Sequence, residues 1–82
     1  MLTMHPAAHG VGDWPELSPD SIAYDVMGLP HGNKAIICKE ASASRWRVNV
    51  RRPKSDKWNW LRGDYASADA ALAALPFEFS AN

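Results

Sequence analysis

The sequence predicts an α+β domain: a three-stranded antiparallel sheet packed on a C-terminal helix, with a short N-terminal helix and an irregular N-terminal arm. Two observations lead to this prediction. Apolar side chains recur at every second position through much of residues 34 to 62, as in strands with one buried face. From residue 67 the chain becomes alanine-rich, and its apolar residues take helical spacing. A chain of 82 residues has room for one modest core.

The N-terminal part of the chain is expected to contain an arm and then a helix. Residues 1 to 17 show no hydrophobic period and contain two prolines and two glycines, which predicts an irregular or mobile arm. Residues 18 to 82 then form the single domain. Its first element is a short helix that begins at the N-cap Ser18 and ends at Gly28. The buried stripe of this helix would consist of Ile22, Val26 and Leu29.

The middle strand of the predicted sheet shows the clearest alternation. It spans residues 45 to 51, with the sequence RWRVNVR, and follows a first strand at residues 34 to 41. Because successive side chains of a strand point to opposite faces, Trp46, Val48 and Val50 are expected to face the core. The outer face of this strand would carry Arg45, Arg47, Asn49 and Arg51.

The third strand, residues 57 to 62, allows two orientations. The binary pattern favours Trp58 and Trp60 facing the core, because Asn59 then stays in solvent. If the tryptophans face outward, the Asn59 amide points at the helix, and burying it unpaired costs about 1–3 kcal/mol. Outward tryptophans beside arginines would form a stacking platform for bases or for side chains of a protein partner.

The C-terminal helix is expected to begin after the N-cap Ser67 and to end at Pro76. Asp69 in its first turn complements the positive end of the helix dipole. Small alanines on the buried face would let the helix approach the sheet closely. That face would consist of Ala68, Ala71, Leu72 and Leu75.

The charges are segregated along a chain whose formal net charge is zero. All nine Lys and Arg residues lie between residues 34 and 62, and the segment 34 to 64 holds only three acidic residues, which leaves it at +6. The flanking segments are acidic. This pattern indicates either a surface that binds a polyanion or an acidic arm that lies on the basic sheet, and an idle solvated face is the simpler alternative.

Other features limit the possible functions. Cys38, the single cysteine, lies in an apolar run and is expected to be buried and unreactive, as suits a reducing compartment. The chain has no apolar run of about 18 residues and no signal-peptide pattern, so we expect a cytoplasmic protein without a membrane span. His5 and His9 lack further ligands at metal spacing. We expect no catalytic residues, no metal and no cofactor.

From residue 45 onward, a basic residue and an aromatic open an alternating strand that ends in Arg. A proline, a basic hairpin, Trp-Leu, Tyr, Ser and an acidic, alanine-rich helix follow. Over residues 35 to 75 this order resembles the DNA-binding domain of the APETALA and ethylene-response-factor type. That family lays the sheet face away from its helix in the DNA major groove, so the resemblance implies outward Trp58 and Trp60. The matching residues are Arg45, Trp46, Val50, Arg51, Pro53, Lys54, Lys57, Trp60, Leu61, Tyr65, Ser67, Asp69 and Ala70.

Two functions are therefore predicted for one surface. The first is a small non-enzymatic module, of a kind found in phages or mobile elements, that binds double-stranded DNA through the outer face of the sheet. The alternative is a small phage-type protein that inhibits or regulates a host protein, for example an anti-defence factor, through the same Arg and Trp surface. The predicted contact residues are Arg45, Arg47, Asn49, Arg51, Lys54, Lys57, Trp58, Trp60 and Arg62.

Overall fold

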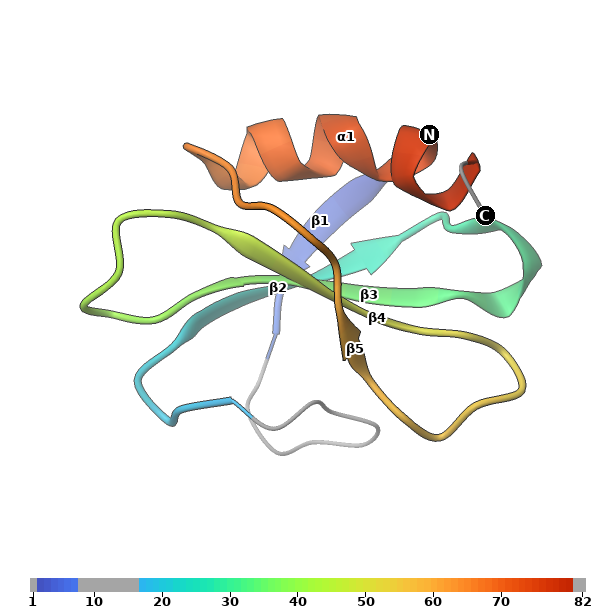
Figure 1. The fold of residues 1–82 in the computed structure, drawn as a ribbon, viewed down its shortest axis with the longest axis horizontal. Helices are drawn as coiled ribbons and strands as arrows, with labels where there is room; N and C mark the ends of the chain where they lie inside the picture. Colours follow the sequence, from blue (N-terminus) through green and yellow to red (C-terminus); the bar gives the residue numbers. More distant parts are fainter. Residues whose placement is uncertain (1, 8–16, 81–82) are drawn as a thin grey trace.

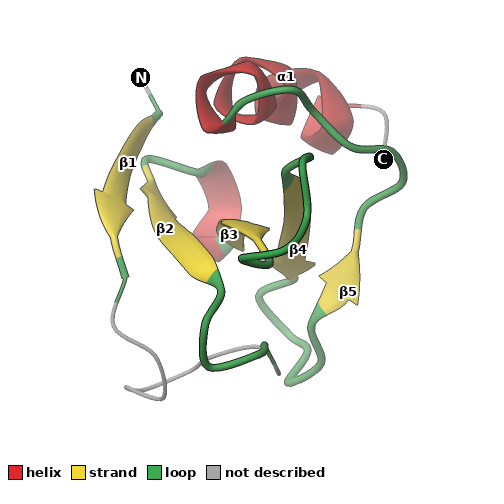
Figure 2. Ribbon diagram, turned by 90° about the vertical axis from the view of Figure 1, so that its left-hand side faces the viewer, coloured by secondary structure: helices red, strands yellow, loops and turns green. Residues whose placement is uncertain are grey.

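The computed structural model of the chain describes residues 2–7 and 17–80, apart from the side chains of residues 31 and 76–80. Five antiparallel strands form one sheet in the order β1-β2-β3-β4-β5, and the helix α1 lies across one face of it (Figure 1, Figure 2). The predicted three-stranded sheet with an N-terminal helix is therefore wrong. The elements are β1 (Thr3–Pro6), β2 (Ile22–Met27), a 3-10 turn (Pro30–Gly32), β3 (Lys34–Lys39), β4 (Arg47–Arg51), β5 (Asn59–Trp60) and α1 (Ala68–Ser80).

The segment predicted as the N-terminal helix forms the strand β2. Ile22 and Val26 are four residues apart, a spacing that returns a side chain to nearly the same face in a helix and to the same face in a strand. Ala23 and Val26 are both buried but belong to apolar clusters on opposite faces of the sheet. Pairing with β1 and β3 satisfies the backbone of β2 on both edges, and its β-branched and aromatic residues suit this position.

The predicted N-terminal arm contributes the edge strand β1. It pairs with β2 from Thr3 opposite Met27 to Pro6 opposite Tyr24. These residues are therefore part of the sheet and not of an irregular arm. Residues 8–16 lie outside the described residues, and so does the prediction that the acidic arm covers the basic sheet.

The alternation predicted for the middle strand is confirmed in β4. Val48 and Val50 are buried on the helix side of the sheet, and Trp46 packs against the same cluster. The rings of Tyr24 and Trp46 lie 5.7 Å apart between centroids, in a tilted arrangement. This contact joins β2 to the segment before β4 and extends the core to the end of the sheet.

The C-terminal helix α1 begins after Ser67, as predicted. The Ser67 Oγ accepts a hydrogen bond from the backbone N–H of Ala70 at 3.1 Å, and Ala71 and Leu75 are fully buried against the sheet. The prediction that Pro76 ends the helix is wrong, because α1 continues to Ser80. A proline removes one backbone hydrogen bond, and the following turn can still form. No helix among the described residues has the length and apolar character needed to cross a bilayer.

Each face of the sheet carries an apolar cluster. The helix-side cluster has buried members from β2, β3, β4 and α1. The cluster on the opposite face is smaller, with Ala23, Ile36 and Cys38 buried and Leu17 and Trp58 packed against them. The opposite face is therefore apolar around Ala23, Ile36 and Cys38 and carries arginines at β4.

Candidate functional site

The edge strand β5 directs Trp60 away from the helix. Trp60 pairs with Asn49 of β4, and paired residues of an antiparallel ladder share a face. Leu61, the next residue, packs against the helix-side cluster. Asn59 pairs with Val50 but stays exposed at the edge of the sheet. The inward orientation favoured by the binary pattern is therefore wrong, and the expected cost of burying the Asn59 amide does not arise.

Arg47 and Trp60 form a stacked pair on this face. The guanidinium carbon of Arg47 lies 4.5 Å from the centroid of the Trp60 ring. Arg47 is exposed, and Trp60 keeps 44% of its surface accessible to solvent. A guanidinium is attracted to the electron-rich face of an indole, so the pair presents flat π surface and positive charge together.

Three of the predicted contact residues lie on or near this face but are largely enclosed. Asn49 is only 3% exposed, and its Oδ1 has no hydrogen-bond partner within the described part of the chain. Arg51 is half-buried, and its Nη1 donates to the Ser55 carbonyl oxygen at 3.2 Å. Trp58 is half-buried against the smaller cluster. These three side chains therefore offer less surface to a ligand than the exposed Arg47 and Trp60 do.

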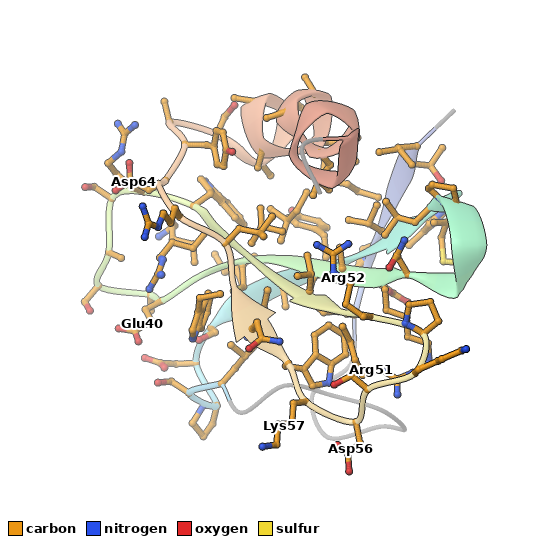
Figure 3. The ribbon with its side chains drawn as sticks, turned by 45° about the vertical axis from the view of Figure 1, so that its right-hand side comes forward. Glu40, Arg51, Arg52, Asp56, Lys57 and Asp64 are labelled. Atoms are coloured by element: carbon orange, nitrogen blue, oxygen red, sulfur yellow. The ribbon has the colours of Figure 1, made fainter. Side chains whose placement is uncertain are left out.

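Four further cations of the predicted surface are exposed: Arg45, Lys54, Lys57 and Arg62. Arg45 Nε donates to Asp64 Oδ1 at 2.6 Å, with both side chains about half exposed. An ion pair this accessible contributes little to stability, so Arg45 can exchange the carboxylate for another anion. Figure 3 shows Lys57 and Asp56 at the hairpin between β4 and β5, with Glu40 and Asp64 near the opposite end of these strands.

A cleft of about 330 Å³ lies beside Trp60 at the end of the sheet where β3 turns into β4. Lys39 Nζ donates to the carbonyl oxygens of Glu40 at 3.2 Å and Ala43 at 2.8 Å, and these bonds hold the turn that forms one wall. Among the described residues, three cations and one carboxylate line the cleft, which gives this part of the lining a positive charge. Its lining includes Ser18, Lys39, Glu40, Arg45, Arg47 and Trp60.

Cys38 also lines the cleft and is 3% exposed. Burial raises the pKa of its thiol to about 11, against the opposing effect of the Arg47 cation, and the Glu40 carboxylate adds to the rise. The thiol therefore keeps its proton at neutral pH and is a poor nucleophile. The cleft has an uncharged surface at this point.

No pattern in the sequence predicts this cleft. Ser18 is predicted as a helix N-cap, and Lys39 falls within the predicted first strand at residues 34 to 41. The two come near the same site because β2 pairs with β3, with Ile22 opposite Lys39. No local pattern in the sequence encodes that pairing, and the concentration of basic residues between 34 and 62 was the one available signal.

Comparison of the chain with family models, with curated proteins and with solved structures finds no match. Among the described residues, no group of three or more His, Cys, Asp or Glu side chains could hold a metal ion. His9 lies outside those residues.

Proposed function

We propose that the protein is a small non-enzymatic nucleic-acid-binding module whose ligand lies along β4 and β5, with double-stranded DNA as the first expected ligand. The observation that supports this best is the exposed Arg47–Trp60 pair at the edge of the sheet. Arg and Trp together provide charge for phosphates and a flat surface for bases or sugars. The resemblance to the APETALA and ethylene-response-factor type domain favours the same face.

Charge supports the same ligand class. Five cations of the predicted contact set are exposed: Arg45, Arg47, Lys54, Lys57 and Arg62. They belong to the segment 34 to 64, whose net charge is +6 while the whole chain is neutral. A surface that concentrates positive charge attracts a polyanion and accelerates its association, even when the net charge of the protein is zero.

The packing of β4 favours phosphate contacts over base reading. Asn49 is buried, and Arg51 is half-buried with a bond to a backbone carbonyl. Of the outward side chains within β4, Arg47 is left as the exposed one. Contacts to phosphates position a protein on nucleic acid without reading its sequence. The proposed module therefore binds with weak sequence preference.

The same surface suits a protein partner, which is the alternative function. Exposed Trp and Arg side chains are enriched among the residues that dominate protein–protein binding energy. Trp60 and Arg47 meet this description. An aromatic interface with a protein depends weakly on salt, whereas phosphate contacts weaken steeply as salt rises.

Fluorescence anisotropy with a labelled DNA duplex at low salt tests the proposal. We expect measurable binding that Arg47→Ala weakens by about tenfold, as loss of one good arginine contact does. Lys34→Ala is the matched control, because it also removes one positive charge. Lys34 lies about 13 Å along β3 from Cys38, and Cys38 is the residue paired with Arg47. Binding no stronger than that of an unrelated neutral protein would refute duplex DNA as the ligand.

A further inference from the structure

We infer that the cleft beside Trp60 holds one unpaired nucleotide, so that the protein prefers single-stranded nucleic acid to duplex. This inference rests on the proposed nucleic-acid binding and replaces duplex DNA by a single strand as the preferred ligand. The cleft volume of about 330 Å³ is at the lower end of the range for small-ligand pockets, about 300–1,000 Å³. A site of this size suits a single base with its sugar, and a duplex is too large to enter it.

The stacked pair explains why the base must be unpaired. Arg47 and Trp60 both line the cleft, with the guanidinium held 4.5 Å from the ring centroid. A base added to this arrangement extends the stack by one layer. Bases inside a duplex already stack on their neighbours and offer only their edges to a protein. Unpaired bases offer their faces, which aromatic rings and guanidinium planes bind.

The charges of the cleft suit the phosphate of that nucleotide. Arg45 and Arg47 line it, and the carboxylate that pairs with Arg45 is about half exposed, so a phosphate oxygen can replace it. Lys39 already donates to two carbonyl oxygens and acts by holding the wall. Within the described part of the lining, Glu40 is the one carboxylate against three cations, so the charge of these residues is positive.

The remaining lining suits a base and not a second anion. Cys38 supplies a neutral, apolar surface. The exposed Ser18 brings a hydroxyl, which can either donate to or accept from the edge of a base. A hydroxyl can therefore form a hydrogen bond with any of the bases. This agrees with a site that binds nucleic acid without strong sequence preference.

The test compares a labelled oligothymidine with a duplex of equal length at the same salt concentration. We expect the single strand to bind more tightly. Trp60→Leu should weaken single-strand binding by about 5- to 150-fold, the usual effect of losing one stacked base, and weaken duplex binding much less. Trp60→Phe keeps a ring and should retain most of the affinity. Arg47→Lys keeps the charge but loses the plane, so it should weaken the single strand more than the duplex.

The outcomes separate this inference from the proposed function. Equal affinity for strand and duplex, or an equal loss on both with Trp60→Leu, would overturn the nucleotide site and leave nucleic-acid binding in place. Binding of neither probe would overturn both. Urea unfolding of each variant establishes that it is folded. If Trp60→Leu does not fold, the single-strand and duplex affinities of Trp60→Phe and Arg47→Lys still test the inference.

Discussion

The guanidinium of Arg47 lies over the ring of Trp60, and this contact joins β4 to the edge strand β5. Asn49 is the direct partner of Trp60 in the ladder, so Arg47 and Trp60 form a diagonal pair two residues away along β4. Long and aromatic side chains can reach each other at that distance. The pair fixes the position of a strand that is only two residues long and presents a charged, aromatic surface to solvent.

The Arg47–Trp60 contact should be measurable as a coupling in stability. A double-mutant cycle of Arg47→Ala and Trp60→Leu, measured by urea unfolding, should give a coupling free energy of about 0.5–1 kcal/mol, as expected for an exposed cation–π pair. If the double variant loses the sum of the free energies lost by the two single variants, the side chains do not stabilise each other.

Asn49→Leu should increase the free energy of unfolding by about 1 kcal/mol, because it removes a buried amide whose Oδ1 lacks a partner in the described residues. Asn59→Leu on the neighbouring strand is the control and should give no gain, since Asn59 is exposed. Urea unfolding measures both. A loss of stability in Asn49→Leu would mean that a bound water or another group satisfies the amide.

Ala71→Leu should destabilise the protein by about 1–3 kcal/mol, because the enlarged side chain pushes α1 away from the sheet. Ala71 has no exposed surface, whereas Ala70 on the same helix is exposed. Ala70→Leu changes the chain by the same atoms and should leave stability nearly unchanged. Equal effects of the two substitutions in urea unfolding would contradict the packing of α1.

Cys38 should make stability fall at alkaline pH. Burial raises the pKa of its thiol from 9.0 to about 11 in the folded protein. As pH rises from 9.0 toward 11, the unfolded chain loses this proton first, so unfolding is favoured by up to about 1.4 kcal/mol per pH unit. The difference in unfolding free energy between the natural chain and Cys38→Ala should therefore shrink over this range. A difference independent of pH would rule out the shifted thiol.

The sequence allowed β4 and the start of α1 to be predicted because each has a one-sided local pattern. Trp46, Val48 and Val50 alternate with polar residues, and Ser67 is a natural helix cap. The segment that forms β2 was predicted as a helix because Ile22 and Val26 satisfy both periods. The strand forms because β2 pairs with β1 and β3, and these pairs join residues that are far apart in the chain.

The candidate site could be predicted only in part, for a related reason. The outward face of β4 follows from alternation, and Arg47 lies on it as predicted. Burial of Asn49 could not be read from the sequence, because it depends on neighbours from other strands that cover this side chain. The orientation of Trp60 could not be predicted from the polarity of its neighbour Asn59. Asn59 pairs with the core residue Val50, yet its side chain stays in water because β5 is an edge strand.

The salt dependence of nucleic-acid binding tests the central claim most directly. For the natural chain, the logarithm of the affinity should fall steeply and linearly with the logarithm of the salt concentration, with a slope of about 0.9 per phosphate contact on duplex and about 0.7 on a single strand. Arg47→Ala should reduce the slope by about one contact, while Trp60→Phe should leave it unchanged. If this slope is near zero for the natural chain and the same for Arg47→Ala, the result would contradict binding through phosphates on this surface.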